Sequence, residues 1–558
     1  NAGSKGIIDG TLYLDGVDQD FVSVFWAEGL LGDATQVNIS NTGTIVTKKA
    51  GASIFVDQDD FLNFNAGSTL ELEDNQPIIP KATYAQSSNI NIRGMINSQL
   101  LCDEPIAVGN IFFNCPGLMT PTSLNLPHNM TVSGNINVLN TNGQQLTLMD
   151  NAGAIPNQNE WMLNIEGDLI ISNTSRVMLA SAGDVSQKFT ATVRNISAGG
   201  QSFVLQGNNN NAIQRTTLNV KGNINHTSGT FSAGSTAINN TADLFIIEMS
   251  GNGTQTINSS AGSFDNTDNQ VTLKINKPTS TGLVNLLSPL SVGRLNLTSG
   301  ILHATSTNYL TIRNITEQSI VLSSTANSFV EGPLRRMVAS TNEIAFATGG
   351  GTVKRSITIK PSSNTATTFE AEYVNSGNGS TTFAAPLEGI EQNYYWKVNR
   401  TSGTANARVK LTLTSAIAGA DAADAIVVAK FASPNWVRAR GNDGTFIVGD
   451  QTTGNAMSED QTTGFGSYTF GYGVQASVLP IKLESFTVKQ VNSAAQLSWR
   501  ISENSNAVSF EIMKSANGIN FSKIGTVTAL DGKFSYDFTD NSLLAGNNYY
   551  RLRMLDKD

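Results

Sequence analysis

Charged side chains are scarce in this sequence. Only 14% of the 558 residues are Asp, Glu, Lys or Arg, whereas roughly 25% is usual for soluble domains. The net charge of −9 is spread thinly, and no basic cluster with interleaved aromatic residues occurs, so we expect no nucleic-acid-binding surface. No apolar run approaches the roughly 18 residues of a membrane-spanning helix, so we expect no membrane span.

Residues that commonly carry catalysis are sparse as well. The three histidines, His128, His226 and His303, lie far apart in neutral surroundings rich in Asn, Ser and Thr. The sequence contains no HExxH, GxSxG, P-loop or GxGxxG motif. We therefore predict no catalytic residue, no cofactor and no metal site, and a protein that is not an enzyme.

Two short acidic clusters leave calcium as an alternative. They are "DGVDQD", from Asp15 to Asp20, and "VDQDD", from Asp57 to Asp60. Neither has the ligand spacing of an EF-hand loop. Solvated carboxylates in turns are the favoured interpretation.

Cysteine is nearly absent: the chain has only Cys102 and Cys115. A secreted protein would pair them, and closing so short a loop stabilises a fold by about 3 kcal/mol in the chain-entropy model. Two buried thiols are the alternative. Because the rest of the composition resembles that of extracellular proteins, we favour the disulfide.

What the sequence has in abundance is glycine, with 50 residues. In "LNVKGNINH" apolar and polar residues alternate, and Gly222 occupies an apolar position. The same pattern recurs in "INIRGMI", "MTVSGNINV" and "LNIEGDLII", around Gly94, Gly134 and Gly167. Period-two alternation predicts strands with one buried face, and a glycine in the inward register predicts a bend.

A strand motif that is broken at one place and repeated along the chain predicts the rung of a stacked coil. The spacings between the glycines are unequal, which excludes a strict-repeat solenoid. An irregular right-handed parallel β-helix with corner loops of variable length fits. The four glycines are then structural corner residues, and the side chains of Ile92, Val132, Ile165 and Val220 should point into the core.

The character of the sequence divides the all-β chain into four parts. Residues 1–36 are dense in large apolar groups and are expected to cap the open β edge of a β-helix over residues 37–328. Longer, more aromatic strands over residues 329–476 predict an antiparallel β-sandwich. Residues 477–558 predict an immunoglobulin- or fibronectin-like domain, with Trp499 in its core and Tyr549, or its neighbour Tyr550, at a tyrosine-corner-like turn.

Two further charged groups invite a functional interpretation. Glu166 and Asp168 flank Gly167 and should face outward together, as a solvated or structural pair; a catalytic carboxylate pair on a polysaccharide-cleaving β-helix is the alternative. Arg335 and Arg336, in "GPLRR", should form hydrogen bonds and ion pairs at the joint between β-helix and sandwich. Binding of an anionic ligand is the alternative there.

The C-terminal part resembles a known family. The segments "VLPIKLESFTVKQVNSAAQLSWRISENSNAVSFEIMKS" and "NNYYRLRMLDKD" resemble the fibronectin-type-III-like module near the C-terminus of Bacteroidota surface proteins exported by type IX secretion. The "EGPLRR" and "YYWKV" segments resemble the sandwich that precedes that module. The resemblance covers roughly residues 329–558 and implies an extracellular or outer-surface location. It also implies the type IX machinery as a partner, through a sorting domain expected beyond Asp558.

The family's cargo includes adhesins, hydrolases and structural proteins, so the resemblance implies no single activity. We expect a secreted or cell-surface structural or adhesive protein, either a rod-like stalk or a self-associating fibre subunit. The alternative is a carbohydrate-binding or carbohydrate-cleaving β-helix with surface glycans as partners. Trp26 and Trp161 are the only tryptophans of the β-helix region, which argues against aromatic platforms for sugars.

The last module contains six predicted strands, whereas a fibronectin-type sandwich has seven. The missing strand would pair beside the last one. Either the polypeptide continues past Asp558 and supplies it, or a neighbouring subunit donates it and the protein polymerises into a filament.

Overall fold

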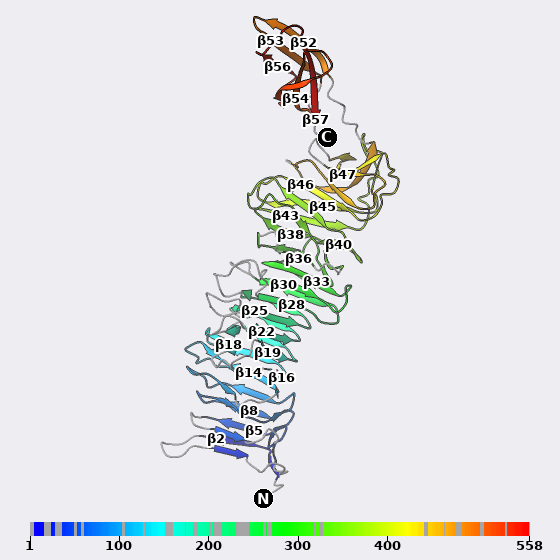
Figure 1. Ribbon diagram of the computed structural model, residues 1–558. Helices are drawn as coiled ribbons and strands as arrows, with labels where there is room; N and C mark the ends of the chain where they lie inside the picture. Colours follow the sequence, from blue (N-terminus) through cyan, green and yellow to red (C-terminus); the bar gives the residue numbers. More distant parts are fainter. Residues whose placement is uncertain are drawn as a thin grey trace. The chain divides into compact units, whose positions relative to one another are not determined.

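The computed structural model shows an all-β protein (Figure 1). It describes residues 5–15, 24–27, 36–48, 53–56, 61–102, 107–126, 129–150, 160–172, 174–181, 188–199, 202–204, 215–229, 231–232, 245–260, 264, 271–315, 320–322, 327–439, 445–461, 464–474, 483–502, 507–530 and 533–556. The chain divides into unit 1 (Asn1–Gly379, Gln392–Lys410, Gln461–Tyr468) and unit 2 (Ser380–Glu391, Leu411–Asp460, Thr469–Asp558). Within the described ranges, no helix is long and apolar enough to cross a membrane.

In unit 1 the chain runs through three faces in turn, and most strands pair in parallel with the strand one coil later. The first face has a 4-stranded sheet of β1 (Lys5–Ile8), β4 (Gln36–Ile39), β7 (Leu62–Phe64) and β10 (Thr83–Tyr84). Its 9-stranded sheet comprises β13 (Ala107–Val108), β16 (Met130–Val132), β19 (Glu160–Ile165), β22 (Lys188–Val193), β25 (Arg215–Val220), β28 (Phe245–Met249), β30 (Val271–Asn276), β33 (Arg294–Ser299) and β36 (Ile320–Leu322).

The second face is a 15-stranded sheet. Its strands are β2 (Thr11–Leu14), β5 (Thr44–Thr47), β8 (Thr69–Leu72), β11 (Asn89–Ile92), β14 (Asn110–Asn114), β17 (Ile136–Asn140), β20 (Leu169–Ile171), β23 (Ile196–Ala198), β26 (Ile224–His226), β29 (Gln255–Ser259), β31 (Leu283–Leu286), β34 (Ile301–His303), β37 (Phe329–Glu331), β40 (Thr348–Gly350) and β41 (Val353–Lys354).

The third face completes each coil with shorter sheets. Its strands are β3 (Val24–Ala27), β6 (Ser53–Val56), β9 (Ile78–Ile79), β12 (Leu101–Cys102), β15 (Thr122–Ser123), β18 (Gln145–Asp150), β21 (Arg176–Ser181), β24 (Ser202–Val204), β27 (Phe231–Ser232), β32 (Leu290–Val292), β35 (Leu310–Ile312) and β38 (Leu334–Val338). This arrangement is the expected parallel β-helix. The strands inside residues 1–36 pair in parallel with β4, β5 and β6, so they form a coil of the stack.

The core of the β-helix consists of apolar columns, because successive coils align the inward positions of their strands. One column of the second face is formed by Ile90, Ile111, Ile136, Leu169, Ile196, Ile224 and Ile257, each paired with the next and all buried. The expected core residues Ile92, Val132, Ile165 and Val220 are at most 1% exposed. The alternation read from the sequence is therefore confirmed.

Three of the four motif glycines lie at one corner, between first-face and second-face strands. A Cβ atom on Gly134 would lie 2.3 Å from the Oδ1 atom of Asn110, and one on Gly222 would lie 2.1 Å from that of Asn195. None of the motif glycines has a positive φ, so lack of space, rather than backbone conformation, requires glycine there. Gly94 differs from the rest. It follows β11 at the next corner, where a Cβ atom would lie 1.9 Å from the carbonyl oxygen of Glu73.

The joint to the sandwich is formed by β38, which pairs in parallel with β35 and antiparallel with β43 (Thr367–Val374). Arg335 donates to the Glu370 carboxylate at 2.6 Å, and its guanidinium lies 3.5 Å from the centre of the Tyr309 ring. Arg336 is 1% exposed and donates to the carbonyl oxygen of Ala345 at 2.5 Å. Its burial lowers the pKa of Arg336 to about 10. Both arginines thus form hydrogen bonds within the joint, as expected. Because β37 and β38 pair in parallel with β34 and β35, the β-helix extends past residue 328, its predicted end.

Beyond the joint β40 still pairs in parallel with β37, and the other pairs described below are antiparallel. In unit 1, β43 pairs with β45 (Tyr395–Ser402), and β39 (Ile344–Phe346) pairs with β42 (Ile357–Pro361). In unit 2, β47 (Asp424–Ala432) pairs with β48 (Asn435–Arg438) and β49 (Ile447–Val448), and β44 (Gly389–Ile390) pairs with the second half of β51 (Ser467–Val474). The remaining strands of this region are β46 (Ala407–Leu413) and β50 (Gly454–Met457).

The last module has two 3-stranded antiparallel sheets. They are β52 (Leu483–Val491), β53 (Ala494–Ile501) and β56 (Ser535–Asp540), and β55 (Ser522–Thr528), β54 (Ala507–Ser515) and β57 (Tyr549–Asp556). Trp499 is 2% exposed and packs against Phe510 and Tyr536, with ring centres 5.3 and 5.9 Å away. It is therefore a core residue, as expected. In the described residues β57 pairs with β54 alone.

The tyrosine assigned to the corner needs correction. Tyr549 is 43% exposed, whereas its neighbour Tyr550 is half-buried and donates from its hydroxyl to the Asp540 carboxylate at 2.7 Å. Lys514 lies 2.6 Å from the same carboxylate. Strand alternation decides between the two tyrosines, because Tyr550 shares the inward face of β57 with Leu552 and Met554.

The disulfide prediction is also wrong, because the structure does not join Cys102 to Cys115. Cys102 ends β12 on the third face, whereas Cys115 directly follows β14 on the second. The Cys115 thiol is buried and donates to the carbonyl oxygen of Ile92 at 3.5 Å. That burial raises the pKa of Cys115 to about 11, which makes the thiol a poor nucleophile.

The corner packing generates a prediction for Gly222→Ala. The added methyl group collides with the Asn195 amide and with the carbonyl oxygen of Arg194, 2.7 Å away, so the free energy of unfolding should fall by about 1–3 kcal/mol. Gly117→Ala is the matched control, because a Cβ atom there meets nothing within 4 Å. Urea unfolding of both variants measures the difference. Equal stability of the two variants would contradict the crowded corner.

Candidate functional site

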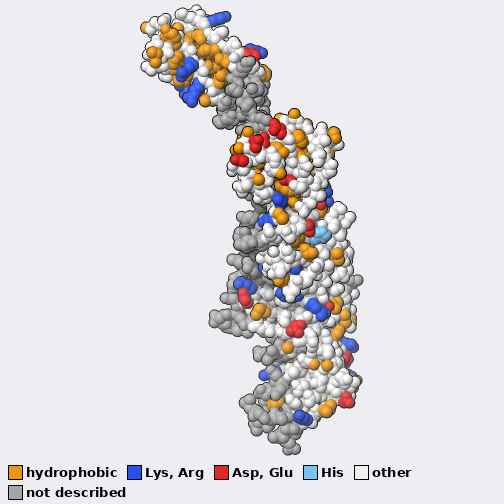
Figure 2. Space-filling model, turned by 90° about the vertical axis from the view of Figure 1, so that its right-hand side faces the viewer, with side chains coloured by type: hydrophobic (Ala, Val, Ile, Leu, Met, Phe, Trp, Pro, Cys, Tyr) orange, Lys and Arg blue, Asp and Glu red, His pale blue; other side chains and the backbone are white. Residues whose placement is uncertain are grey.

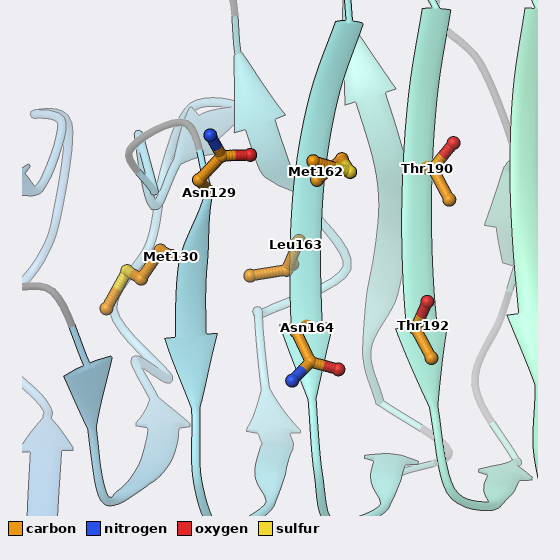
Figure 3. A pocket seen from close by; sticks show the side chains of 7 residues that line it. All are labelled: Asn129, Met130, Met162, Leu163, Asn164, Thr190 and Thr192. Atoms are coloured by element: carbon orange, nitrogen blue, oxygen red, sulfur yellow. The ribbon is translucent and has the colours of Figure 1, made fainter.

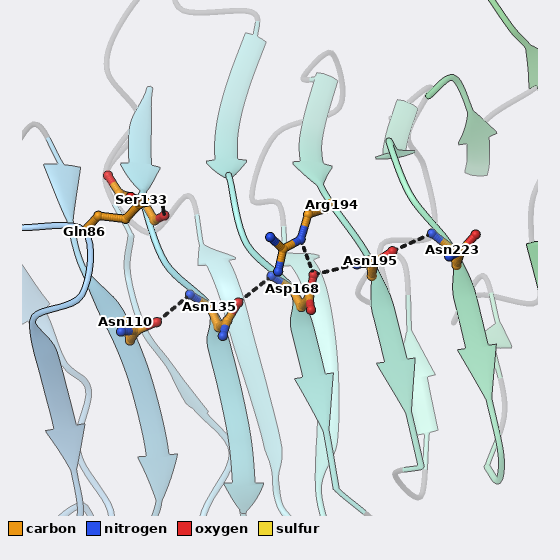
Figure 4. Close-up of polar contacts among 8 residues, drawn as sticks. All are labelled: Gln86, Asn110, Ser133, Asn135, Asp168, Arg194, Asn195 and Asn223. Atoms are coloured by element: carbon orange, nitrogen blue, oxygen red, sulfur yellow. Dashed lines mark hydrogen bonds and ion pairs between the residues drawn. The ribbon is translucent and has the colours of Figure 1, made fainter. Parts of the chain in front are cut away.

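The corner between the first and second faces carries a continuous row of polar side chains, which we call the amide ladder (Figure 4). Its members are Asn89, Asn110, Asn135, Asp168, Asn195 and Asn223. The Oδ1 atom of Asn110 accepts from the backbone N–H of Asn135 at 2.9 Å, and that of Asn195 accepts from the N–H of Asn223 at 2.7 Å. Asn135 and Asn223 likewise accept a backbone N–H from the next coil. These four members thus satisfy corner N–H groups that sheet pairing leaves without a partner, whereas Asn89 and Asp168 accept from side-chain N–H groups of the next coil.

The same geometry explains why glycine precedes the ladder residues. Gly134, Gly167 and Gly222 each come immediately before a ladder member, and their backbones run directly over the amide of the coil before. In one coil Arg194 replaces the glycine, and its side chain extends outward to Asp168. The Gly-Asn step of the motif is therefore a structural unit.

Asp168 is the one carboxylate of the ladder. Its Oδ1 atom accepts from Arg194 Nε at 2.8 Å and from Asn195 Nδ2 at 2.9 Å. Partial burial raises its pKa, but the hydrogen bonds from Arg194 and Asn195 outweigh this and lower the pKa overall. Glu166 is exposed. Asp168 is thus held ionised with Oδ1 already hydrogen-bonded, which supports the structural interpretation of this pair over the catalytic one.

His226 takes a place in a core column, between Ala198 and Ser259 of the adjacent coils. Its Nδ1 atom lies 2.9 Å from the Ser259 hydroxyl, and the Phe231 ring packs edge-on at 4.5 Å. Burial lowers the pKa of His226, so the imidazole is neutral at pH 7. His303 lies apart on β34, and His128 lies outside the described residues.

Sequence reasoning missed Lys277, a buried lysine next to the ladder. It is 2% exposed and donates to the carbonyl oxygen of Gly253 at 2.8 Å and to the side-chain oxygen of Gln255 at 2.7 Å. Burial lowers the pKa of Lys277 to about 8. No signal in "KINKPTS" marks this residue, because lysines at the ends of strands ordinarily point into solvent.

A hollow of about 340 Å³ opens on the first face and is the candidate binding site (Figure 3). We call it the first-face hollow. It is lined by Asn129, Met130, Met162, Leu163, Asn164, Thr190 and Thr192. The side chain of Met162 is 47% exposed. Asn129 has a φ of 61°, a conformation that Asn tolerates, and its backbone N–H donates to the carbonyl oxygen of Met162 at 3.0 Å, which fixes the position of Asn129 at the rim of the hollow.

The surface around the hollow is nearly uncharged. Figure 2 shows charged side chains as isolated spots on the described surface of unit 1. On the first face, Lys188 pairs with Glu160 at 3.1 Å and Lys274 pairs with Glu248 at 3.0 Å. These pairs leave little net charge to attract an ionic ligand.

The described residues hold no cluster of three or more His, Cys, Asp or Glu that could bind a metal ion. Of the two acidic clusters, Asp15 is described and exposed. The other aspartates, from Asp18 to Asp60, lie outside the described residues. Calcium binding there stays a prediction without a structural test.

Comparison of the chain with protein-family models, with curated proteins and with solved structures finds no match. The features that bear on function are therefore the amide ladder, the joint and the first-face hollow. The outward residues of the hollow occupy the polar positions of alternating strands, which the sequence does show. The sequence does not show which of these strands pair, and therefore which outward residues become neighbours.

Lys277 generates a prediction about pH. Its folded pKa of about 8 lies below its ordinary value of 10.5, so the unfolded chain binds more protons between these values and the free energy of unfolding should rise with pH there. Lys277→Met keeps the apolar stem and removes the charge, so it should raise this free energy at pH 7 by about 1–3 kcal/mol. It should also flatten the rise above pH 8.

The control for this experiment is Lys221→Met, which removes an exposed lysine two coils earlier. Chemical unfolding at pH 7, 8, 9 and 10 gives the comparison. An unchanged pH profile in Lys277→Met would show that Lys277 does not carry the buried charge.

Proposed function

We propose that this protein is a secreted or outer-surface structural protein with an adhesive role, exported by type IX secretion. The observation that carries the proposal is the amide ladder, in which the polar residues of the repeated motif bond coil to coil. A motif whose polar side chains are already engaged in such bonds extends the stack rather than building a reaction site.

The joint supports the same proposal. Because β38 belongs to the third face of the β-helix and also pairs antiparallel with β43, the β-helix passes into the sandwich through continuous hydrogen bonding. The Arg335–Glu370 ion pair lies across this pairing. A tensile load on unit 1 would therefore be shared by backbone ladders rather than by a flexible linker.

The export route rests on the resemblance of residues 329–558 to type IX cargo. Among the described residues of this module, six strands in two sheets and the Trp499 core support the resemblance to a fibronectin-like module. A surface composed largely of amides and hydroxyls also suits an extracellular stalk. A stalk and a fibre subunit are two forms of this function, and sedimentation of the purified chain distinguishes a monomer from a polymer.

The proposal predicts surface display. Antibodies raised against the chain should label intact cells of the source bacterium, and a strain with disrupted type IX secretion should lose the label. Deletion of the gene should reduce attachment to surfaces without changing growth. A protein confined to the cytosol, or attachment that is unchanged in the deletion strain, would contradict the proposal.

A second prediction separates adhesion from catalysis. The purified chain should release no oligosaccharides from neutral or acidic polysaccharides, with or without calcium, because Asp168 is held in the amide ladder. The measurement is a reducing-end assay with wild type, Glu166→Gln and Asp168→Asn. Release by wild type that disappears in these variants would establish a carbohydrate-cleaving β-helix.

A further inference from the structure

The first-face hollow has a regular arrangement set by strand pairing. Met162 on β19 pairs with Thr190 on β22, and Asn164 pairs with Thr192. Neighbouring strands lie about 4.8 Å apart, and residues i and i+2 about 6.7 Å apart. The four outward side chains therefore occupy the corners of a small rectangle, with the thioether at one corner and groups that both donate and accept hydrogen bonds at the others (Figure 3).

The lining excludes most ligand classes. None of its residues is titratable, so it supplies no charge-assisted bond for an anion and no carboxylate for a divalent cation. Of its three apolar residues, Met130 and Leu163 are 1% exposed, which leaves Met162 as the exposed apolar contact. A ligand that fits must be uncharged, rich in hydroxyl groups, and provided with a C–H surface for the thioether.

The polar column of the hollow continues along the stack. Asn164 pairs with Thr131 of the preceding coil, and Thr192 pairs with Asn219 of the following one. A chain lying across the strands would therefore meet a hydroxyl or an amide about every 4.8 Å. This favours a polymer over a single small molecule.

We propose that the first-face hollow and its polar column bind a neutral polysaccharide that lies across β16, β19, β22 and β25. The inference rests on the proposed adhesive function and names the ligand class of that function. The Thr190 and Thr192 hydroxyls and the Asn164 amide hydrogen-bond the sugar hydroxyls, and Met162 packs against the ring.

The experiment is calorimetric titration of the full chain with fragments of neutral β-glucan, mannan and galactan, and with polygalacturonate fragments of equal length. At least one neutral fragment should bind saturably, and the acidic fragments should not compete with it. The double variant Thr190→Val/Thr192→Val should weaken binding at least tenfold, because valine keeps the branched shape and removes the hydroxyl groups.

Thr358→Val is the matched control, because Thr358 is a half-buried threonine on β42, outside the hollow, and this variant should bind as wild type does. Unfolding curves of the variants verify that each remains folded. Failure of every neutral fragment to bind, equal binding of acidic fragments, or wild-type affinity in the double variant would overturn the inference. If attachment of cells still depends on the gene in that case, the adhesive function stands and only the site is wrong.

Discussion

The β-helix depends on one interaction, the hydrogen bond from a corner N–H to the side-chain oxygen of the previous coil. Between β16 and β17, or between β25 and β26, the chain changes direction and its amides leave the sheet ladders. The Oδ1 atoms of Asn110 and Asn195 accept two of these N–H groups. Where such an amide lies directly beneath the backbone of the next coil, as at Gly134 and Gly222, there is no room for a Cβ atom, and glycine is required.

This constraint also explains why the few ionisable groups near the ladder are structural. Asp168 replaces an amide and is held ionised by Arg194 and Asn195. Lys277 donates to the carbonyl oxygen of Gly253 and to the side-chain oxygen of Gln255. Gln255 in turn donates to the carbonyl oxygen of Gly222. Groups that would be nucleophiles or bases in a cleft are used here to hold neighbouring coils together, so the recognition that we propose is assigned to the outward faces of the strands. The first-face hollow is such a place.

The alternation of the motif strands predicted their inward residues correctly because burial in a strand has period two, and Ile165 and Val220 needed no further information. Sequence-based predictions failed where the answer depends on which residues are neighbours in three dimensions. Cys102 and Cys115 are close in sequence, but winding places them on different faces, and the Cys115 thiol bonds to Ile92. Tyr549 and Tyr550 are indistinguishable in sequence, and only pairing with β54 shows that Tyr550 faces inward.

By itself the sequence determined the fold class, the repeated strand and the place of the corner glycines, because these follow from local alternation and from a missing side chain. Only the tertiary structure decided what each corner glycine accommodates, that Gly94 belongs to a different corner, and which outward residues become neighbours. Met162 and Thr190 lie 28 positions apart in the sequence and face each other only because β19 and β22 pair in that register. Loops of unequal length between coils hide this register from the sequence, and the hydrogen bonds of the stack fix it.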